Sequence, residues 1–180
     1  MPAHKRGFTL VELLVVIAII AVLSTVGLVT YSTVQKSGRM SKRIQDLKAI
    51  QTALELYYSV NKAYPVGGWR SECANWGGLS ANDVVKDASS GKTLVSQFMP
   101  AFPSDPAMDA AASTSCYVYL SDGIDYKVAD LNVSEITAAD LPAYRNFWDP
   151  NSSGYPTPCS PVTGINRKLA IWTSDASRCW

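Results

Sequence analysis

Histidine is almost missing from this sequence, since His4 is the one histidine among its 180 residues. The chain beyond it has no imidazole to act as the base of a Ser-His-Asp triad or a Cys-His pair, which excludes those mechanisms. Charge is also scarce, at 17% Asp, Glu, Lys and Arg, whereas an average soluble domain has about 25%. The net charge of +1 offers no strongly basic surface, so we expect no nucleic-acid partner.

A long run of apolar residues lies near the N-terminus. Phe8 to Val29 is a run of 22 residues, of which 17 are apolar and only Glu12 is charged. About 20 such residues cross a bilayer as a helix. The sequence therefore predicts a membrane-spanning helix over residues 8–29, with a soluble remainder.

The residues that flank this run bear on its orientation and fate. Lys5 and Arg6 precede it, which places the N-terminus in the cytoplasm by the positive-inside rule, although the basic residues 36, 39, 42 and 43 argue the other way. An ordinary cleaved secretory signal has a shorter apolar region, of roughly 7–15 residues, followed by a small-x-small site. The longer run favours a retained anchor.

The start of the run carries a specific motif, a basic leader that ends in Gly7 and is followed by Phe8-Thr9-Leu10-Val11-Glu12. It resembles the type III signal of type IV pilins and type II secretion pseudopilins. The resemblance implies that residues 1–7 are a leader, that a prepilin peptidase cuts between Gly7 and Phe8, and that the new Phe8 amine is N-methylated. It further implies a homo-polymer assembled through the N-terminal helices by an inner-membrane platform and its ATPase.

Glu12 is the most informative residue of the run. A carboxylate within a bilayer costs roughly 2.5–3.5 kcal/mol at its centre and is usually functional. After cleavage, Glu12 of one subunit can pair with the Phe8 amine of its neighbour, which removes two unpaired charges from an apolar core. The plainer alternative is a glutamate whose side chain reaches the membrane interface.

Residues 30–64 form the predicted stem, an amphipathic helix that continues the first one. Its apolar residues recur with helical spacing, at Met40, Ile44, Leu47, Ile50, Leu54, Tyr57 and Tyr58. The other face is polar and is expected to meet solvent; it carries Arg39, Arg43, Asp46, Lys48 and Glu55. Asn61 and Pro65 are expected to end the helix.

Residues 65–180 form the predicted head, where Gly and Pro are frequent. Residues 115–120 and 124–129 alternate around an Asp-Gly turn and predict a β-hairpin, and 168–173 predicts a third strand. Short helices are expected over 83–98 and 135–144. The predicted fold class is α+β, with a small antiparallel sheet packed on the second half of a long N-terminal helix.

The four cysteines all lie in the head. In an exported domain they predict two disulfides, for which three pairings are possible. Resemblance to pilins favours Cys73–Cys116 and Cys159–Cys179, because the second pair would close the C-terminal loop as in many pilins. A zinc site is the alternative, but no C-x-x-C spacing is present.

Calcium is the cofactor alternative; otherwise we expect none. Asp122, Asp125 and Asp130 offer oxygen ligands near a turn, and resemblance to calcium-binding pseudopilins adds Asp175. A plain Asp-Gly turn explains Asp122 and Gly123 equally well. The acid pairs Asp122/Asp125 and Asp105/Asp109 are expected on the solvated surface rather than in a catalytic dyad.

The aromatic residues of the head leave a second function open. Packed in a core they are structural, whereas facing outward they would suit an adhesin or lectin; they are Trp69, Trp76, Tyr144, Phe147, Trp148, Tyr155, Trp172 and Trp180. The favoured interpretation is a non-enzymatic filament subunit of a type IV pilus or type II secretion pseudopilus. We expect it first as a single-pass protein of the inner membrane and then in a filament outside the cytoplasm. The alternative is a monomeric membrane-anchored binding module.

Overall fold

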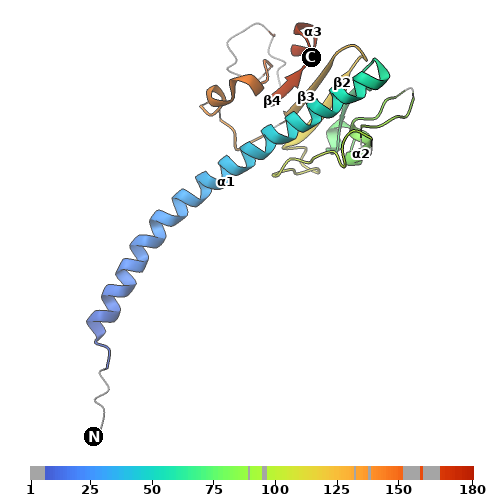
Figure 1. Ribbon diagram of the computed structural model, residues 1–180. Coiled ribbons are helices and arrows are strands. Elements are labelled where there is room, and N and C mark those ends of the chain that lie inside the picture. Colours follow the sequence, from blue (N-terminus) through green and yellow to red (C-terminus); the bar gives the residue numbers. More distant parts are fainter. Residues whose placement is uncertain are drawn as a thin grey trace. The chain divides into compact units, whose positions relative to one another are not determined.

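The computed structural model describes residues 7–88, 90–94, 97–131, 133–137, 139–151, 159 and 167–180, without the side chains of 25–30, 81, 82, 141, 167 and 168. The chain has two compact units, Met1–Gly38 and Arg39–Trp180. Figure 1 follows the elements in sequence colours. The second unit holds all four strands and both disulfides.

Helix α1 (Leu10–Asn61) contributes to both units. It ends where the sequence predicts. The Asn61 side chain donates to the Tyr57 carbonyl over 3.0 Å, and Lys62 turns into the left-handed region with φ of 59°. In that conformation its N–H donates to the Tyr58 carbonyl over 2.8 Å, so a lysine fills the C-terminal position that glycine usually takes. Pro65 then prevents the helix from resuming.

The sheet is antiparallel, and its strands follow one another in the order β1-β2-β3-β4. The strands are β1 (Gly67–Ser71), β2 (Cys116–Ser121), β3 (Tyr126–Leu131) and β4 (Arg167–Trp172). Strands β2 and β3 form the predicted hairpin, and β4 is the predicted third strand. At the hairpin turn, the Asp122 carboxylate accepts from the N–H groups of Ile124 and Asp125, both over 2.8 Å, and Gly123 has a φ of 96°. The predicted α+β architecture is confirmed.

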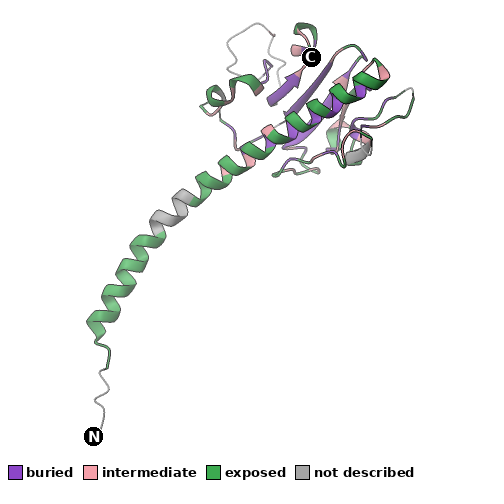
Figure 2. Cartoon of the chain, viewed as in Figure 1, coloured by how far each residue is buried: buried purple, intermediate pink, exposed green. Residues whose placement is uncertain are grey.

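Alternation along the strands gives the sheet two buried faces. One face packs against the C-terminal part of α1, whose buried side is visible in Figure 2. Its core comprises Leu47, Ile50 and Leu54 of α1 with Tyr119, Tyr126, Val128 and Leu169 of the sheet, all fully buried. The other face holds a smaller cluster of Val118, Ala129, Leu131 and Ala170, on which Trp69, Trp76 and Trp172 pack. Fully burying each aliphatic core side chain is worth about 1.5–3 kcal/mol.

The short helices differ from the prediction. The helix expected over 83–98 is wrong: α2 (Ala81–Val84) stops after four residues, and Lys86 then pairs with Thr93 in an antiparallel bridge. Helical structure was expected over 135–144, whereas the 3₁₀ helix η2 occupies Leu141–Phe147. Two further turns of helix were not predicted, η1 (Ala74–Trp76) and α3 (Asp175–Arg178).

Candidate functional site: the N-terminal junction and the polar clusters of the head

The processing junction lies in the first unit, directly before α1. Gly7 has open space around it, since an added Cβ would meet no atom within 4 Å. Phe8 is 83% exposed. Backbone that is free of steric contacts and outside a helix is the form that a peptidase requires.

Glu12 caps the first turn of its own helix. The Thr9 hydroxyl and the Thr9 N–H both donate to Glu12 Oε2, over 2.7 and 2.8 Å, and the Glu12 N–H donates back to the Thr9 hydroxyl over 3.2 Å. This is a capping box, with Thr9 as N-cap and Glu12 three residues later. Sequence reasoning missed it, although the Thr-x-x-Glu spacing before an apolar run predicts it.

The helical surface that follows is apolar and exposed. Its large side chains are between 46% and 83% exposed, from Phe8, Leu10, Val11, Leu13, Leu14, Val15, Val16 and Ile17 to Ile19, Ile20, Val22 and Leu23. No helix among the described residues has the length and apolar character needed to cross a membrane. An exposed apolar surface of this extent indicates a binding surface.

In the second unit, Arg43 departs most from its predicted place. It was expected on the solvated side of the stem but is fully buried, because three carboxylates from distant segments surround it. Arg43 Nε and Nη2 donate to Asp105 over 2.5 and 3.0 Å, Nη1 lies 2.5 Å from Glu135, and Nε lies 3.3 Å from Asp130. Burial opposes the charge, but the hydrogen bond and the charge of Asp105 raise the pKa of Arg43.

Two further predictions about this region are wrong, again because partners from distant segments bury a charged side chain. Asp46, expected on the polar side of the stem, is buried and accepts from the Tyr117 hydroxyl over 3.2 Å. Asp105, expected in a solvated acid pair with Asp109, is buried on Arg43. Asp109 instead accepts from the N–H groups of Ala111 and Ala112 in its own turn.

Glu135 joins Arg43 to a second arginine of α1. Arg39 Nε and Nη2 donate to Glu135 Oε2 over 2.8 and 2.5 Å. Burial would raise the pKa of Glu135, but the hydrogen bonds from Arg39 and Arg43 lower it. The name Arg43 cluster is used below for Arg39, Lys42, Arg43, Asp46, Asp105, Asp130 and Glu135.

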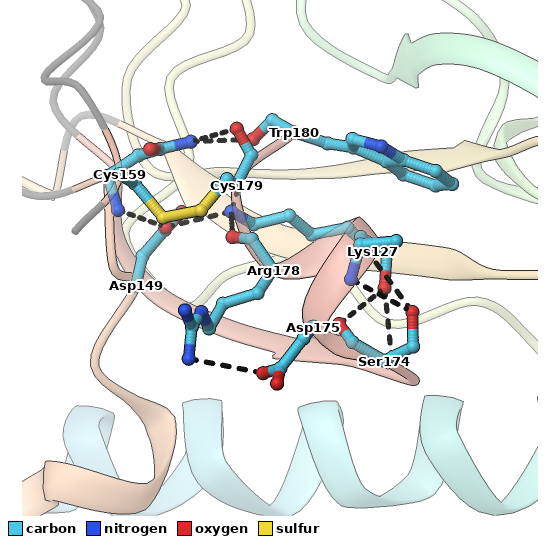
Figure 3. The surroundings of a disulfide bond; sticks show 11 residues. Lys127, Asp149, Cys159, Ser174, Asp175, Arg178, Cys179 and Trp180 are labelled. Carbon is cyan, nitrogen blue, oxygen red and sulfur yellow. Dashed lines mark hydrogen bonds and ion pairs between the residues drawn. A yellow bond between two sulfur atoms is a disulfide. The ribbon is translucent and has the colours of Figure 1, made fainter.

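Lys127 is the second fully buried cation, and it lies on the opposite face of the sheet. Its Nζ donates to Asp149 over 2.9 Å and to the backbone oxygens of Arg178 and Trp180 over 2.7 and 3.1 Å. Asn151 donates to the oxygens of Cys179 and Trp180 beside it. Figure 3 shows Lys127, Asp149 and residues 178–180 next to the Cys159–Cys179 bond.

The disulfides join Cys73 to Cys116 and Cys159 to Cys179, the pairing that resemblance favoured. The first pair ties the start of β2 to the loop after β1. The second pair fastens the segment after α3 to Cys159. Both disulfides therefore close long loops of the head, where such bonds stabilise most.

The four calcium candidates lie in different surroundings. Asp122 caps the hairpin turn, Asp125 accepts from the Thr173 hydroxyl, and Asp175 pairs with Arg178. Asp130 lies in the Arg43 cluster. Among the described residues, no three His, Cys, Asp or Glu side chains gather in a way that could hold a metal ion.

Most of the aromatic residues singled out in the head take part in packing. Trp148 is buried in the main core, and Tyr144 and Phe147 pack against it. Trp69 and Trp76 meet edge to face, with ring centroids 6.2 Å apart, over the smaller cluster. Tyr155 lies outside the described residues. The packed positions favour the structural interpretation over an outward-facing sugar-binding surface.

Comparison with known proteins agrees with the geometry of the junction. Residues 2–28 match the prokaryotic N-terminal methylation motif. The N-terminal part of the chain therefore carries the pattern of this motif, which leads into helix α1.

The similar proteins include a prepilin peptidase-dependent protein, a type IV major pilin and a core protein of a type II secretion system. Prepilin peptidase-dependent protein D of Escherichia coli K12 is 42% identical over 52 residues, which are 29% of this chain and 36% of that protein. Type IV major pilin protein PilA of Myxococcus xanthus DK1622 is 36% identical over 61 residues, which are 34% of this chain and 28% of that protein. Type II secretion system core protein G of Escherichia coli K12 is 36% identical over 61 residues, which are 34% of this chain and 42% of that protein.

These matches cover less than half of the relatives' own length. No solved structure matches the chain. The similarity to these relatives therefore concerns about a third of the chain.

Proposed function

We propose that this chain is a structural subunit of a type IV pilus or a type II secretion pseudopilus. It is cleaved between Gly7 and Phe8, N-methylated on Phe8 and polymerised through its N-terminal helix. The observation that carries the proposal is the methylation motif at the start of a helix whose apolar side chains are exposed and whose first turn holds one carboxylate. Such a helix is suited to a bundle of its own copies, because packing against other copies buries its apolar surface.

The chain resides in the inner membrane before assembly, held by its apolar segment from Phe8 to Val29. A prepilin peptidase that also methylates, and an assembly platform with its ATPase, are the partners in this proposal. The role is structural rather than catalytic, in keeping with the pilin and pseudopilin subunits that the chain resembles.

Glu12 supplies the contact between subunits. Its Oε2 accepts both hydrogen bonds from Thr9, so Oε1 is the oxygen that can accept from a donor of another subunit. The Phe8 amine of a neighbouring subunit, created by cleavage, is a cation of the right charge for that oxygen. Pairing the two neutralises both charges inside an apolar bundle.

Mass spectrometry of the protein from its native host tests the processing step. A mature chain that begins at Phe8 with one added methyl group is expected. A chain that keeps Met1, or one cut further along the apolar run, would contradict the proposal.

Two matched substitutions separate the charge of Glu12 from its capping role. Glu12→Gln keeps a hydrogen-bonding side chain for the capping box but loses the charge, so membrane insertion is expected to persist while filament yield falls at least tenfold. Thr9→Ala removes the cap but keeps the charge, so the yield is expected to fall less. Electron microscopy and a sheared-filament assay measure both; normal assembly of Glu12→Gln would refute the pairing.

Deleting the gene distinguishes the two filament types. Loss of surface filaments indicates a pilus subunit, whereas retention of secreted proteins inside the cell envelope indicates a pseudopilus subunit. Filaments and secretion that both remain unchanged would refute the proposed role.

A further inference from the structure

The charges of the Arg43 cluster do not balance. It has three cations, Arg39, Lys42 and Arg43, and four carboxylates. Each cation has a carboxylate of its own: Arg39 binds Glu135, Lys42 binds Asp46 and Arg43 binds Asp105 through two nitrogens. Asp130 is the fourth carboxylate and has no such cation.

The position of Asp130 makes a lone negative charge costly. The residue is fully buried, and neither carboxylate oxygen has a hydrogen-bond partner among the described residues. Arg43 Nε approaches to 3.3 Å, but this nitrogen already donates to Asp105. An ionised carboxylate that is buried without hydrogen bonds usually takes up a proton instead.

The groups that face Asp130 come from every element around it. Helix α1 contributes Arg43, β2 contributes Tyr117 opposite Asp130 in the register, and the loops contribute Asp105 and Glu135. Burial and the nearby charge of Asp105 raise the pKa of Asp130 well above its ordinary value, and Arg43 offsets only part of this rise. The remaining neighbour across the sheet, Leu169 of β4, is apolar.

We propose that Asp130 keeps its proton at neutral pH and that this proton allows strand β3 to bury a fourth carboxyl group in the Arg43 cluster. The protonated carboxyl leaves three cations facing three carboxylates, so the cluster is neutral. Loss of the proton places a second buried anion beside Asp105, and Arg43 offsets only part of its cost. The contribution of Asp130 to the stability of the head is therefore larger in acid than in alkaline surroundings, whatever assembly the chain enters.

The direction of the pH dependence follows from linkage. A carboxyl whose pKa is higher in the folded than in the unfolded chain gives its full stability below the unfolded value, about 3.9 for Asp. That stability is lost as the pH rises toward the folded value. Carboxylates that are paired in the native state act in the opposite direction, so Asp130 must be isolated by substitution.

The test compares the full-length chain with its Asp130→Asn variant, both in detergent, by urea unfolding between pH 4 and pH 9. Asparagine has nearly the shape of a protonated aspartate, so the two proteins are expected to agree within about twofold in their unfolding constants at pH 4. At pH 8 the unfolding constant of the variant is expected to be at least a thousandfold smaller than that of the unsubstituted chain, because each pH unit between the unfolded pKa of Asp and neutral pH contributes a factor of ten. Equal or lower stability of Asp130→Asn at pH 8 would overturn the proposal.

A control variant and a spectroscopic measurement complete the test of the Asp130 proton. Asp105→Asn is the matched control, because it removes the carboxylate that Arg43 uses; it is expected to unfold more readily at pH 8. Infrared spectroscopy of the unsubstituted chain reports the proton directly, through the carbonyl band of a protonated carboxyl that disappears in Asp130→Asn. The absence of that band at pH 7 would overturn the proposal even if Asp130→Asn did not fold.

Discussion

Strand β3 carries the two most contrasting polar regions of the molecule, one on each of its faces. On the side of α1, the Arg43 cluster gathers side chains from the helix, two loops and the strand. On the other side, Lys127 donates to the Asp149 carboxylate and to the backbone oxygens of Arg178 and Trp180. The first region joins the helix to the head through several side chains of both signs, whereas the second fastens the C-terminal segment through one lysine. Burial of a cation therefore says little about its role until its acceptors are counted.

Removing Arg43 is expected to have the largest effect. Arg43→Met leaves Asp105 and Glu135 partly or fully buried without their shared cation, which costs about 3–5 kcal/mol of unfolding free energy. Urea unfolding followed by near-ultraviolet circular dichroism measures this loss. Lys86→Met is the control, because the side chains of Lys86 and its partner Asp83 are both 46% exposed, and it should change stability little. A loss as small as that of the control would show that the cluster does not hold the helix.

Removing Lys127 is expected to cost less, about 3 kcal/mol, because only one carboxylate is left without a cation. Lys127→Met should also loosen the C-terminal segment, since two of its backbone oxygens lose their donor. Hydrogen exchange at residues 174–180 measures the loosening. Exposed Lys86, which pairs with Asp83, supplies the control Lys86→Met. Unchanged protection of the segment in Lys127→Met would refute its part in fastening it.

Tyr117→Phe is expected to have the smallest effect, and it tests whether the two polar regions are independent of each other. Tyr117→Phe removes one hydrogen bond to Asp46 and should cost about 1–2 kcal/mol. Because Tyr117 and Lys127 point to opposite faces of the sheet, the losses from Tyr117→Phe and Lys127→Met should add within about 0.5 kcal/mol. The double variant, measured by the same unfolding assay, tests this. A clear departure from additivity would mean that the two regions are coupled through the strand.

Two elements of the fold could be predicted from short stretches of sequence alone. The Asp-Gly turn between alternating segments gave the hairpin, and Asn61 with Pro65 gave the helix end. Strand β1 was missed because Gly67-Gly68-Trp69-Arg70 has little β propensity and no alternation; it forms by pairing with β2. The helix expected from 83 was overridden in the same way by the bridge from Lys86 to Thr93.

The Arg43 cluster could not be predicted from periodicity. Helical spacing assigns Arg43 to the polar side of the stem by residue type alone, whereas its burial depends on Asp105 and Asp130, which lie 62 and 87 positions further along the chain. A charged residue next to the apolar face becomes a core residue only when distant partners neutralise it. The capping box of Thr9 and Glu12, in contrast, was visible in four consecutive residues.

The order of the strands determines which sheet edges a neighbouring head could pair with. A meander of four strands has two free edges, at β1 and at β4, and unprotected edges recruit strands from other molecules. Here β1 is short and its register with β2 shifts between Gly67 and Arg70, while Trp148 bridges Leu169 along the outer side of β4. Both edges thus offer an interrupted row of hydrogen-bonding groups. Heads held side by side at high local concentration would stay separate folding units instead of merging into a continuous intermolecular sheet.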